Sequence, residues 1–286
     1  MDINKVFRLG RVLILLLTLL AAIFFYGAPV SDQTSLSGEA FSMENALSTV
    51  KEITKAPHPV ESDEHARVAD FLTRSLQEMG LEPEIQETTY SLEDTEYSCE
   101  VKNIFTYVKG SDPQKTLLFS AHYDSTENSP GAGDNGAAVA SLLESIRVLQ
   151  TEPALKNNVI FLFCDAEEYA AFGSRAFSEH HPLAKEVDLV FNFDGRGNGG
   201  PVLMFETSAN NSWLIREFDR ATSHPVGTSL SNAVYKYMPN YTDFTFFMHH
   251  IEGAEGLNFA HIENPRAYHD SSDTWDTLDP GVIRHV

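Results

Sequence analysis

The sequence predicts an α/β fold in which helices cover both faces of a largely parallel sheet. Two observations lead to this prediction. Short apolar runs that end at polar residues are typical of buried strands, and they alternate with segments whose apolar residues recur at helical spacing. Such alternation favours parallel strands joined by helical crossovers. The length of 286 residues suits one large domain or two small ones.

The N-terminal residues differ from the remainder of the chain. Lys5, Arg8 and Arg11 precede an apolar run at residues 12–28. A membrane-spanning helix needs ~17–25 such residues, and the aromatic residues near the end of the run are typical of a membrane interface. A cleaved signal peptide is the alternative, but no A-x-A cleavage signal follows. We therefore predict an uncleaved single-pass anchor within residues 1–30, with the N-terminus in the cytoplasm and the remainder outside it.

The remainder of the chain is strongly acidic. Residues 1–30 hold three basic residues and one acid of the 20 and 41 in the whole chain, which leaves 17 Lys and Arg against 40 Asp and Glu. Such a surface repels nucleic acid, and the sequence contains no basic patch, so we expect no nucleic-acid partner. Cys99 and Cys164 do not form a disulfide framework. Cys164 lies in an apolar run, which indicates a buried free thiol.

After a polar linker at residues 31–42, two helices and two strands are expected. The helices lie at residues 44–55 and 62–79. The second helix begins at the N-cap Ser62, carries an apolar stripe and ends before a glycine. Residues 84–108 alternate weakly and are rich in Thr, Tyr and Val, which predicts two strands joined by a short loop.

Strands and helices then alternate to the end of the chain. Apolar runs predict strands at residues 116–120, 159–164, 189–193, 202–205 and 257–260. Helical spacing predicts helices at residues 137–149, from Glu167 onward, near 212–221 and near 241–249. Asp279 and Pro280 are typical of the start of a further helix. Because this helix has only six residues in which to form, we expect the chain to be a fragment of a longer protein.

Acidic and imidazole side chains follow the ends of the predicted strands. In open α/β sheets, ligands bind outside the carboxyl ends of the strands. Each of these residues alone has an ordinary explanation, such as a helix cap or a hydrogen-bonded polar group. Together, imidazoles and carboxylates in this order predict a metal site. The residues are His122, Asp134, Glu167, Glu168, Asp194 and His269.

The number and type of these residues predict a site for two metals. Two metals ~3.5–4 Å apart need a ligand that binds both, and the carboxylate of Asp134 can bridge them. Each metal then takes one imidazole and one further carboxylate. Asp124 can hold the second ring nitrogen of His122. One of the two glutamates, Glu167 and Glu168, can bind metal while its neighbour acts as general base.

A dinucleotide-binding motif is the competing interpretation of one loop. Gly131, Gly133 and Gly136 spell G-x-G-x-x-G between a strand and a helix. However, the loop before Gly131 is too long for the tight turn of that motif, and Asp134 would put a carboxylate where phosphates bind. The glycines more plausibly let the backbone turn sharply and carry Asp134 to the metals.

Several motifs beyond residue 45 resemble one peptidase family. They are HYD (122–124), GAGDNGAAVA (131–140), AEE (166–168), GSRAF (173–177), NFDGRGNGGP (192–201), NYTDFT (240–245) and YHDSSDT (268–274). Together they resemble the di-zinc peptidases that include bacterial leucyl aminopeptidases. The membrane-bound branch of that family, with the endoplasmic-reticulum and vacuolar membrane metallopeptidases, is the most similar.

The resemblance implies a three-layer α/β/α phosphorylase/hydrolase-like fold with a mixed, largely parallel sheet, here at residues 43–286 with its final helix cut short. It implies two zinc ions, one on His122, Asp134 and Asp194 and the other on Asp134, Glu168 and His269. It also implies Glu167 as general base and a cis peptide bond between Asp134 and Asn135. Asp194 departs from the membrane-bound branch, which often has Glu there, but soluble relatives use Asp.

The function that follows is a membrane-anchored zinc metallopeptidase that removes N-terminal residues from peptides. Tyr241 is a candidate for holding the oxyanion, although simple packing explains it equally well. A glutaminyl cyclase is the first alternative, because these enzymes share the implied fold with a single zinc. They tend to carry Trp where this chain has Tyr268. A catalytically inactive receptor ectodomain is the second, but such relatives have lost ligands and none is missing here.

Overall fold

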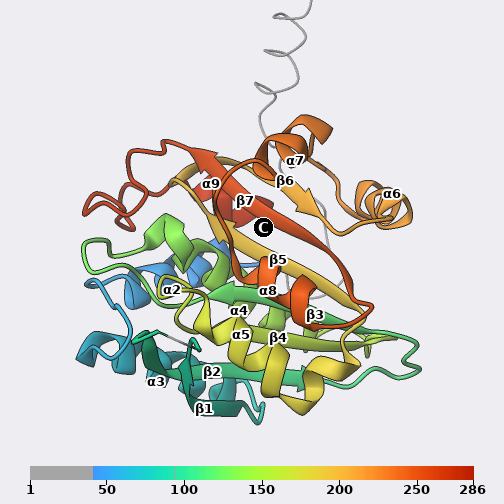
Figure 1. Cartoon of the computed structure of the whole chain (residues 1–286), viewed down its shortest axis with the longest axis horizontal. Helices are drawn as coiled ribbons and strands as arrows, with labels where there is room; N and C mark the ends of the chain where they lie inside the picture. The colour runs from blue at the N-terminus through green and yellow to red at the C-terminus, as the bar shows by residue number, and fades with distance from the viewer. Residues whose placement is uncertain (1–40, 94) are drawn as a thin grey trace, which may run out of the picture. The chain divides into compact units, whose positions relative to one another are not determined.

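The computed structural model describes residues 41–93 and 95–286, which form a mixed sheet of seven strands with helices on both faces (Figure 1). The strand order is β1-β2-β4-β3-β5-β7-β6. The strands are β1 (Glu84–Ser91), β2 (Ser98–Val108), β3 (Thr116–His122), β4 (Asn158–Cys164), β5 (Leu189–Gly195), β6 (Gly199–Thr207) and β7 (Glu255–Glu263).

The parallel part of the sheet is smaller than predicted. The central strands β4, β3, β5 and β7 run parallel, whereas β1 and β2 on one side and β6 on the other pair antiparallel with their neighbours. Residues 92–97 between β1 and β2 are too few for a helical crossover, which a parallel pair requires, so these strands form a hairpin. The expected mixed α/β architecture is confirmed, with its parallel strands at the centre.

Helices cover the two faces in separate layers. The helices are α2 (Met43–Ile53), α3 (Asp63–Glu78), α4 (Ala137–Leu149), α5 (Phe172–His180), α6 (Ser212–Ala221), α7 (Ser229–Tyr235), α8 (Asp243–His250) and α9 (Pro280–His285). Apolar residues of α2, α3, α4, α6 and α9 pack on one face of the sheet, and those of α5 and α8 pack on the other. Burial of these two apolar layers is the main stabilising contribution to the fold.

The local signals for helix ends are confirmed. The side chain of Ser62 accepts a hydrogen bond from the backbone N–H of His65 (3.1 Å) and caps α3. Gly80 follows α3 with φ of 78°, a left-handed conformation that suits glycine. Asp279 caps α9 in the same way, accepting a hydrogen bond from the N–H of Gly281 (2.8 Å).

The helix expected from Glu167 onward begins later, at Phe172. Residues 165–171 form a loop in which Ala166, Ala170 and Ala171 have positive φ. The carboxylate of Asp124 accepts hydrogen bonds from the backbone N–H groups of Glu167 (3.0 Å) and Glu168 (3.1 Å). These bonds hold the two glutamates in the loop, so the chain turns before α5 can start.

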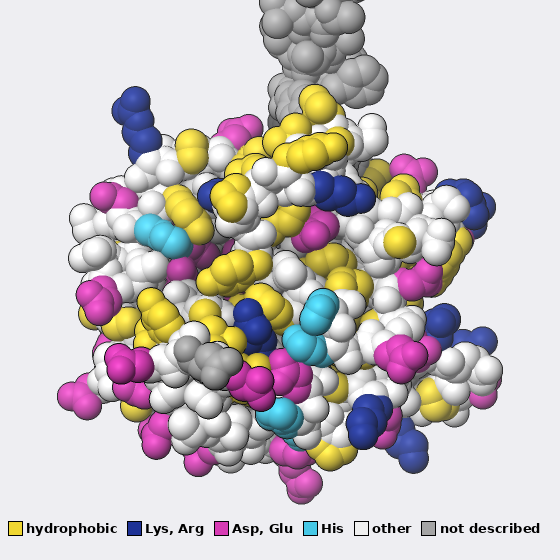
Figure 2. Space-filling model, viewed as in Figure 1, with side chains coloured by type: hydrophobic (Ala, Val, Ile, Leu, Met, Phe, Trp, Pro, Cys, Tyr) yellow, Lys and Arg dark blue, Asp and Glu magenta, His cyan; other side chains and the backbone are white. Residues whose placement is uncertain are grey.

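Helix α7 was not expected from the sequence. None of its residues is buried, so it lacks the apolar stripe on which sequence prediction depends. Instead it exposes apolar side chains, and Leu230, Val234 and the nearby Tyr237 are 69%, 51% and 92% exposed. Figure 2 shows hydrophobic side chains gathered over this part of the molecule.

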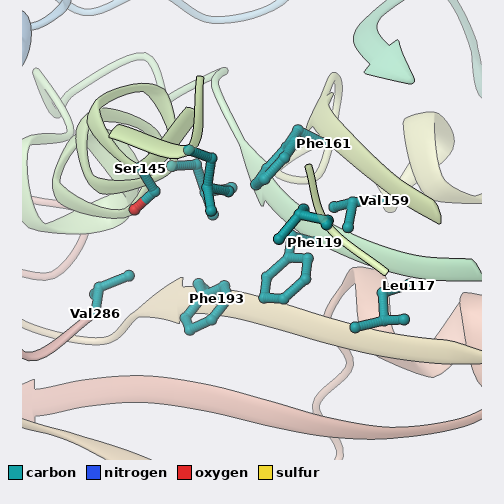
Figure 3. A pocket seen from close by; sticks show the side chains of 10 residues that line it. Leu117, Phe119, Ser145, Val159, Phe161, Phe193 and Val286 are labelled. Carbon is teal, nitrogen blue, oxygen red and sulfur yellow. The ribbon is translucent and has the colours of Figure 1, made fainter. Parts of the chain in front are cut away.

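An apolar pocket lies on the face of the sheet that α4 covers (Figure 3). Its lining includes Phe119, Phe161 and Phe193 from three neighbouring strands, Ser145 from α4, and Val286. None of the predicted metal ligands or catalytic residues lines this pocket. The pocket is therefore separate from the predicted site.

Two other predictions concern the cysteines and the N-terminus. Cys99 and Cys164 are both unpaired, and Cys164 is buried, as expected; Cys99 is buried as well. The helices formed by residues 41–93 and 95–286 are all too short or too polar to cross a membrane. The predicted anchor within residues 1–30, and the predicted linker up to residue 40, lie outside the described residues.

Candidate metal centre

The predicted ligands come together at the carboxyl ends of the parallel strands. His122 is the last residue of β3, and Asp194 lies near the end of β5. The others lie in loops that follow strands: Asp134 before α4, Glu167 and Glu168 after β4, and His269 after β7. Because parallel strands end at one edge of the sheet, segments far apart in sequence deliver their side chains to one place.

Asp134 is at the centre of this arrangement. Its Oδ1 lies 3.1 Å from Nε2 of His122, and its Oδ2 lies 3.2 Å from Nε2 of His269. The side chain of Asp134 is only 3% exposed. Each oxygen of one buried carboxylate thus faces a different imidazole, which is the orientation that a bridging ligand needs.

Two further carboxylates complete the set. Oδ1 of Asp194 lies 3.7 Å from Nε2 of His122, and Oε1 of Glu168 lies 3.1 Å from Nε2 of His269. Three groups of residues have ligand atoms that all lie within 4.8 Å of one another. They are His122, Asp134 and Asp194; Asp134, Glu168 and His269; and His122, Glu167 and Glu168. The first two are the predicted ligand sets, and both contain Asp134.

The donor atoms fit a transition metal such as zinc. Neighbouring ligand atoms on a tetrahedral zinc with bonds of ~2.0–2.2 Å lie ~3.3–3.6 Å apart. The four ligand–ligand distances above run from 3.1 to 3.7 Å, so small shifts would suffice for coordination. Imidazole nitrogen and carboxylate oxygen are also the donors that zinc accepts.

The loop that carries Asp134 is held by hydrogen bonds that the sequence analysis missed. The buried carboxylate of Asp273 accepts hydrogen bonds from the N–H groups of Gly133 (2.8 Å) and Asp134 (3.1 Å). The peptide bond between Asp134 and Asn135 is cis, as expected. A Cβ atom at Gly133 would collide with the backbone oxygen of Gly197, so this glycine serves close packing of the loop.

Asp124 supports the site from two directions. Its carboxylate accepts the N–H groups of Glu167 and Glu168, as described above. The second ring nitrogen of His122, Nδ1, lies 3.1 Å from the backbone oxygen of Asp124 and 3.4 Å from its Oδ1. Either oxygen orients the ring so that Nε2 faces Asp134. The predicted support of His122 by Asp124 is present, whereas the hydrogen bonds from both glutamates to Asp124 were not predicted.

Burial and crowding of like charges change the proton affinities of the carboxylates. Burial raises the pKa of Glu167 well above its ordinary value, and the charge of Asp194 adds to the effect. Burial, with the charge of Asp134, raises the pKa of Glu168 to about 7. Burial alone would raise the pKa of Asp134 too, but hydrogen bonds from His122 and His269 lower it to about 2. The three acids are thereby made chemically distinct.

Tyr241 lies at the edge of this cluster. It is 47% exposed, and its ring contacts the ring of Phe246 edge-on with centroids 5.6 Å apart. Burial, with the charges of Glu167 and Glu168, raises the pKa of Tyr241. The residue therefore packs against a neighbour and also lies within electrostatic reach of the site.

A second buried acid near the site was also missed. Asp243, in the first turn of α8, is 1% exposed, and burial raises its pKa to about 7. The charges of Asp124 and Asp194 contribute to this rise. Asp243 and Asp273 both stand inside motifs that the sequence analysis singled out, NYTDFT and YHDSSDT. Neither acid follows the end of a strand, so their place inside these motifs was the sequence signal that could have identified them.

Relatives with similar sequences are peptidases named for the endoplasmic reticulum or the vacuolar membrane. Endoplasmic reticulum metallopeptidase 1 of Homo sapiens is 30% identical over 223 residues, which cover 75% of this chain and 25% of that protein. The vacuolar membrane protease of Candida albicans (strain WO-1) is 28% identical over 247 residues, covering 85% of this chain and 29% of that protein. The chain thus spans between a quarter and a third of the length of these relatives.

Solved structures with the same fold include an aminopeptidase and a glutaminyl cyclase. The aminopeptidase from Aneurinibacillus sp. strain AM-1 superposes with a TM-score of 0.69 at 13% identity, over 85% of this chain and 90% of that one. The glutaminyl cyclase of Porphyromonas gingivalis gives 0.68 at 19% identity, over 86% and 94%. At such low identity these likenesses establish the fold alone.

The sequence family is established by a family model. The model of peptidase family M28 matches residues 103–286, which is more than half of the chain and includes every predicted metal ligand. This chain therefore belongs to peptidase family M28.

Proposed function

We propose that the chain is the catalytic part of a zinc-dependent aminopeptidase, anchored in a membrane through residues 12–28 with its N-terminus in the cytoplasm. The observation that carries the proposal is the position of Asp134, whose two oxygens face His122 and His269 at 3.1 and 3.2 Å. Membership of a peptidase family and the names of the membrane-bound relatives support it.

Two zinc ions are assigned to this centre. His122, Asp134 and Asp194 would hold one, and Asp134, Glu168 and His269 would hold the other. When bound, the ions would supply Lewis acidity toward the scissile carbonyl and lower the pKa of an attacking water.

Glu167 is assigned as the general base. It takes a proton from the attacking water and returns it to the leaving amine. Its carboxylate lies beside the predicted ligands, because ligand atoms of His122, Glu167 and Glu168 all lie within 4.8 Å of one another, which puts it within reach of a water at the centre. Asp124 fixes the backbone at Glu167 and so fixes the direction of this carboxylate. Tyr241 keeps its proton at neutral pH and donates it in a hydrogen bond to the developing oxyanion.

The test combines metal analysis with three classes of substrate. The full chain is loaded with zinc and incubated with aminoacyl anilides, with their N-acetylated forms and with peptides that begin with Gln. We expect two zinc ions per chain, cleavage of the free aminoacyl substrates, and no cleavage of the acetylated ones, with Glu167→Gln as the inactive control.

Other results would contradict the proposal in distinguishable ways. Cyclisation of N-terminal Gln with a single bound zinc would identify an acyltransferase of the kind seen among the structural neighbours. Tight zinc binding without turnover of any substrate would favour a binding domain. Loss of membrane association on deletion of residues 1–30 would support the anchor, and unchanged association would refute it.

A further inference from the structure

A second group of imidazole and carboxylate side chains lies where helices α5 and α8 end. Glu179 and His180 are the last two residues of α5, and His249 and His250 are the last two of α8. Nε2 of His250 lies 3.1 Å from Oε1 of Glu179 and 3.4 Å from Nδ1 of His249. Nε2 of His180 lies 3.8 Å from Oε2 of the same carboxylate. Figure 2 shows histidine side chains beside acidic ones over this part of the molecule.

Histidines in the last turn of a helix have an ordinary explanation, but it does not fit His250. A positively charged imidazole there interacts favourably with the negative end of the helix dipole. Burial instead lowers the pKa of His250, against the opposing charge of Glu179. The charges of His249 and Arg175 lower this pKa further. The ring of His250 is therefore neutral at pH 7, and a neutral imidazole is the form that binds a metal ion.

The distances within the group suit a shared metal ion. Neighbouring ligand atoms on a tetrahedral zinc lie ~3.3–3.6 Å apart. The contacts of His250 with Glu179 and His249, at 3.1 and 3.4 Å, fall in the same range as the ligand–ligand distances of the centre described above. His249 is exposed, so its ring can turn toward the carboxylate and bring the three donor atoms around one ion.

The surroundings of Glu179 hold its carboxylate in place and attract a cation. The hydroxyl of Tyr90 donates a hydrogen bond to Oε1 of Glu179 (2.9 Å), and a ligating carboxylate is oriented by hydrogen bonds of this kind. The terminal carbonyl groups of α5 and α8 carry partial negative charge and also favour a cation. The charge of Arg175 reaches His250 and opposes a bound ion, so we expect an ion that exchanges with solution.

We propose that this group, which we call the helix-end site, binds a divalent transition-metal ion such as zinc in equilibrium with the free ion. Its ligands are Glu179, His180, His249 and His250. The ion joins the ends of two helices that lie far apart in sequence, and it stabilises the fold because it binds only when these helices are packed together. The helix-end site shares no residue with the candidate metal centre and does not depend on the proposed function.

Zinc binding by matched variants tests the helix-end site. The full chain and its variants are dialysed to equilibrium against a series of buffered zinc concentrations, and bound zinc is measured by atomic emission. We expect wild type to bind one more zinc ion per chain than His249→Gln or His250→Gln. Glu179→Gln keeps an acceptor for Tyr90 but removes a charged ligand, so it should weaken binding of this ion by at least about 10-fold. Because the readout is a difference, it holds whatever number of ions the centre binds.

A histidine outside the group provides the control. The imidazole of His224 lies beside Ser223, in the segment between α6 and α7. His224→Gln should therefore bind as much zinc as wild type. Equal zinc binding by wild type, His249→Gln and His250→Gln at every concentration would overturn the proposal. Equal loss of zinc in His224→Gln and His250→Gln would also overturn it, because it would identify unspecific binding to surface histidines.

Thermal unfolding tests whether the ion joins the two helices. Zinc at ~100 times the Kd of the helix-end site should raise the Tm of wild type by ~5–10 °C more than the Tm of His249→Gln. An equal rise in both proteins would contradict the proposal. His249 is exposed, so its substitution leaves the packing of α8 intact and decides the question even if His250→Gln does not fold. The Tm of each variant without added zinc shows whether it is folded.

Discussion

Two carboxylates divide the work of organising the centre. Asp134 presents one oxygen to each imidazole, and Asp124 receives the backbone N–H groups of both glutamates. Because Asp124 fixes Glu167 and Glu168 in a loop instead of a helix, the different roles proposed for them depend on where the loop points each side chain. The two adjacent acids therefore provide the sharpest test of function at single residues.

Substitution of the two glutamates should have different consequences. Glu167→Gln keeps the shape of the side chain and removes the base, so zinc content should persist while kcat falls by ~10²–10⁴-fold. Glu168→Gln removes a charged ligand, so zinc affinity should fall by more than the ~10–100-fold typical of changes behind the ligands. Chelator competition and steady-state kinetics measure both. Near-normal turnover in Glu167→Gln, or loss of its zinc as easily as in Glu168→Gln, would show that the roles are assigned wrongly.

Among the elements, the loop between β3 and α4 depends most on distant residues. Asp273, far along the chain, accepts two of its backbone N–H groups. Helix α4 in turn is joined to α2 through Glu144, whose carboxylate accepts hydrogen bonds from the N–H of Ser42 (2.8 Å) and the side chain of Asn45 (3.3 Å). Single buried acids thus connect segments that the sheet alone does not connect.

Removal of the Asp273 carboxylate should loosen the loop that carries Asp134. Asp273→Ala leaves two buried N–H groups without an acceptor, at a cost of about 1–3 kcal/mol each. We expect a lower urea midpoint and weaker zinc binding. The nearby exposed residue Asp276 provides the control, since Asp276→Ala should change neither quantity. Equal behaviour of the two variants would contradict this account of the loop.

Glu144 should make stability depend on pH. Burial would raise its pKa, but its ion pair with Arg147 and its hydrogen bonds lower the pKa below the ordinary 4.5. A carboxyl group with a lowered pKa stabilises the fold above its unfolded-state value and loses that contribution as pH falls through the folded-state value. Glu144→Gln should therefore cost about 1–3 kcal/mol at pH 7 and progressively less below pH 4.5. Urea titrations of wild type and Glu144→Gln at pH 7 and below pH 4.5 measure this difference in stability. A difference that does not change with pH would be inconsistent with the account.

Across the whole molecule, the sequence predicted best where local signals and burial agree. Helix α4 begins and ends where its apolar spacing predicted, and the parallel strands follow the apolar runs. The predicted start of α5 was wrong because backbone hydrogen bonds to the carboxylate of Asp124, distant in sequence, override local preference. Helix α7 was not predicted because none of its residues is buried. Likewise, the candidate ligands could be predicted because they follow strands, whereas Asp273, which acts on backbone groups, could be noticed only through its motif.

Metal removal should destabilise the entire domain. A ligand present at about 1,000 times its Kd stabilises the folded state by ~4.1 kcal/mol, and ~1 kcal/mol shifts Tm by ~2–4 °C in a domain of about this size. We therefore expect a chelator to lower Tm by several degrees and added zinc to restore it. Asp134→Asn, which removes a charge from the bridging ligand, should show a smaller response to zinc. An unchanged Tm on chelation would contradict metal binding at a folded site.

The most direct test of the two-zinc centre is anomalous diffraction at the zinc absorption edge from crystals of the zinc-loaded chain. The account predicts two anomalous peaks, one beside His122 and one beside His269, with a different oxygen of Asp134 in contact with each. A single peak, or two peaks of which one does not touch Asp134, would contradict it.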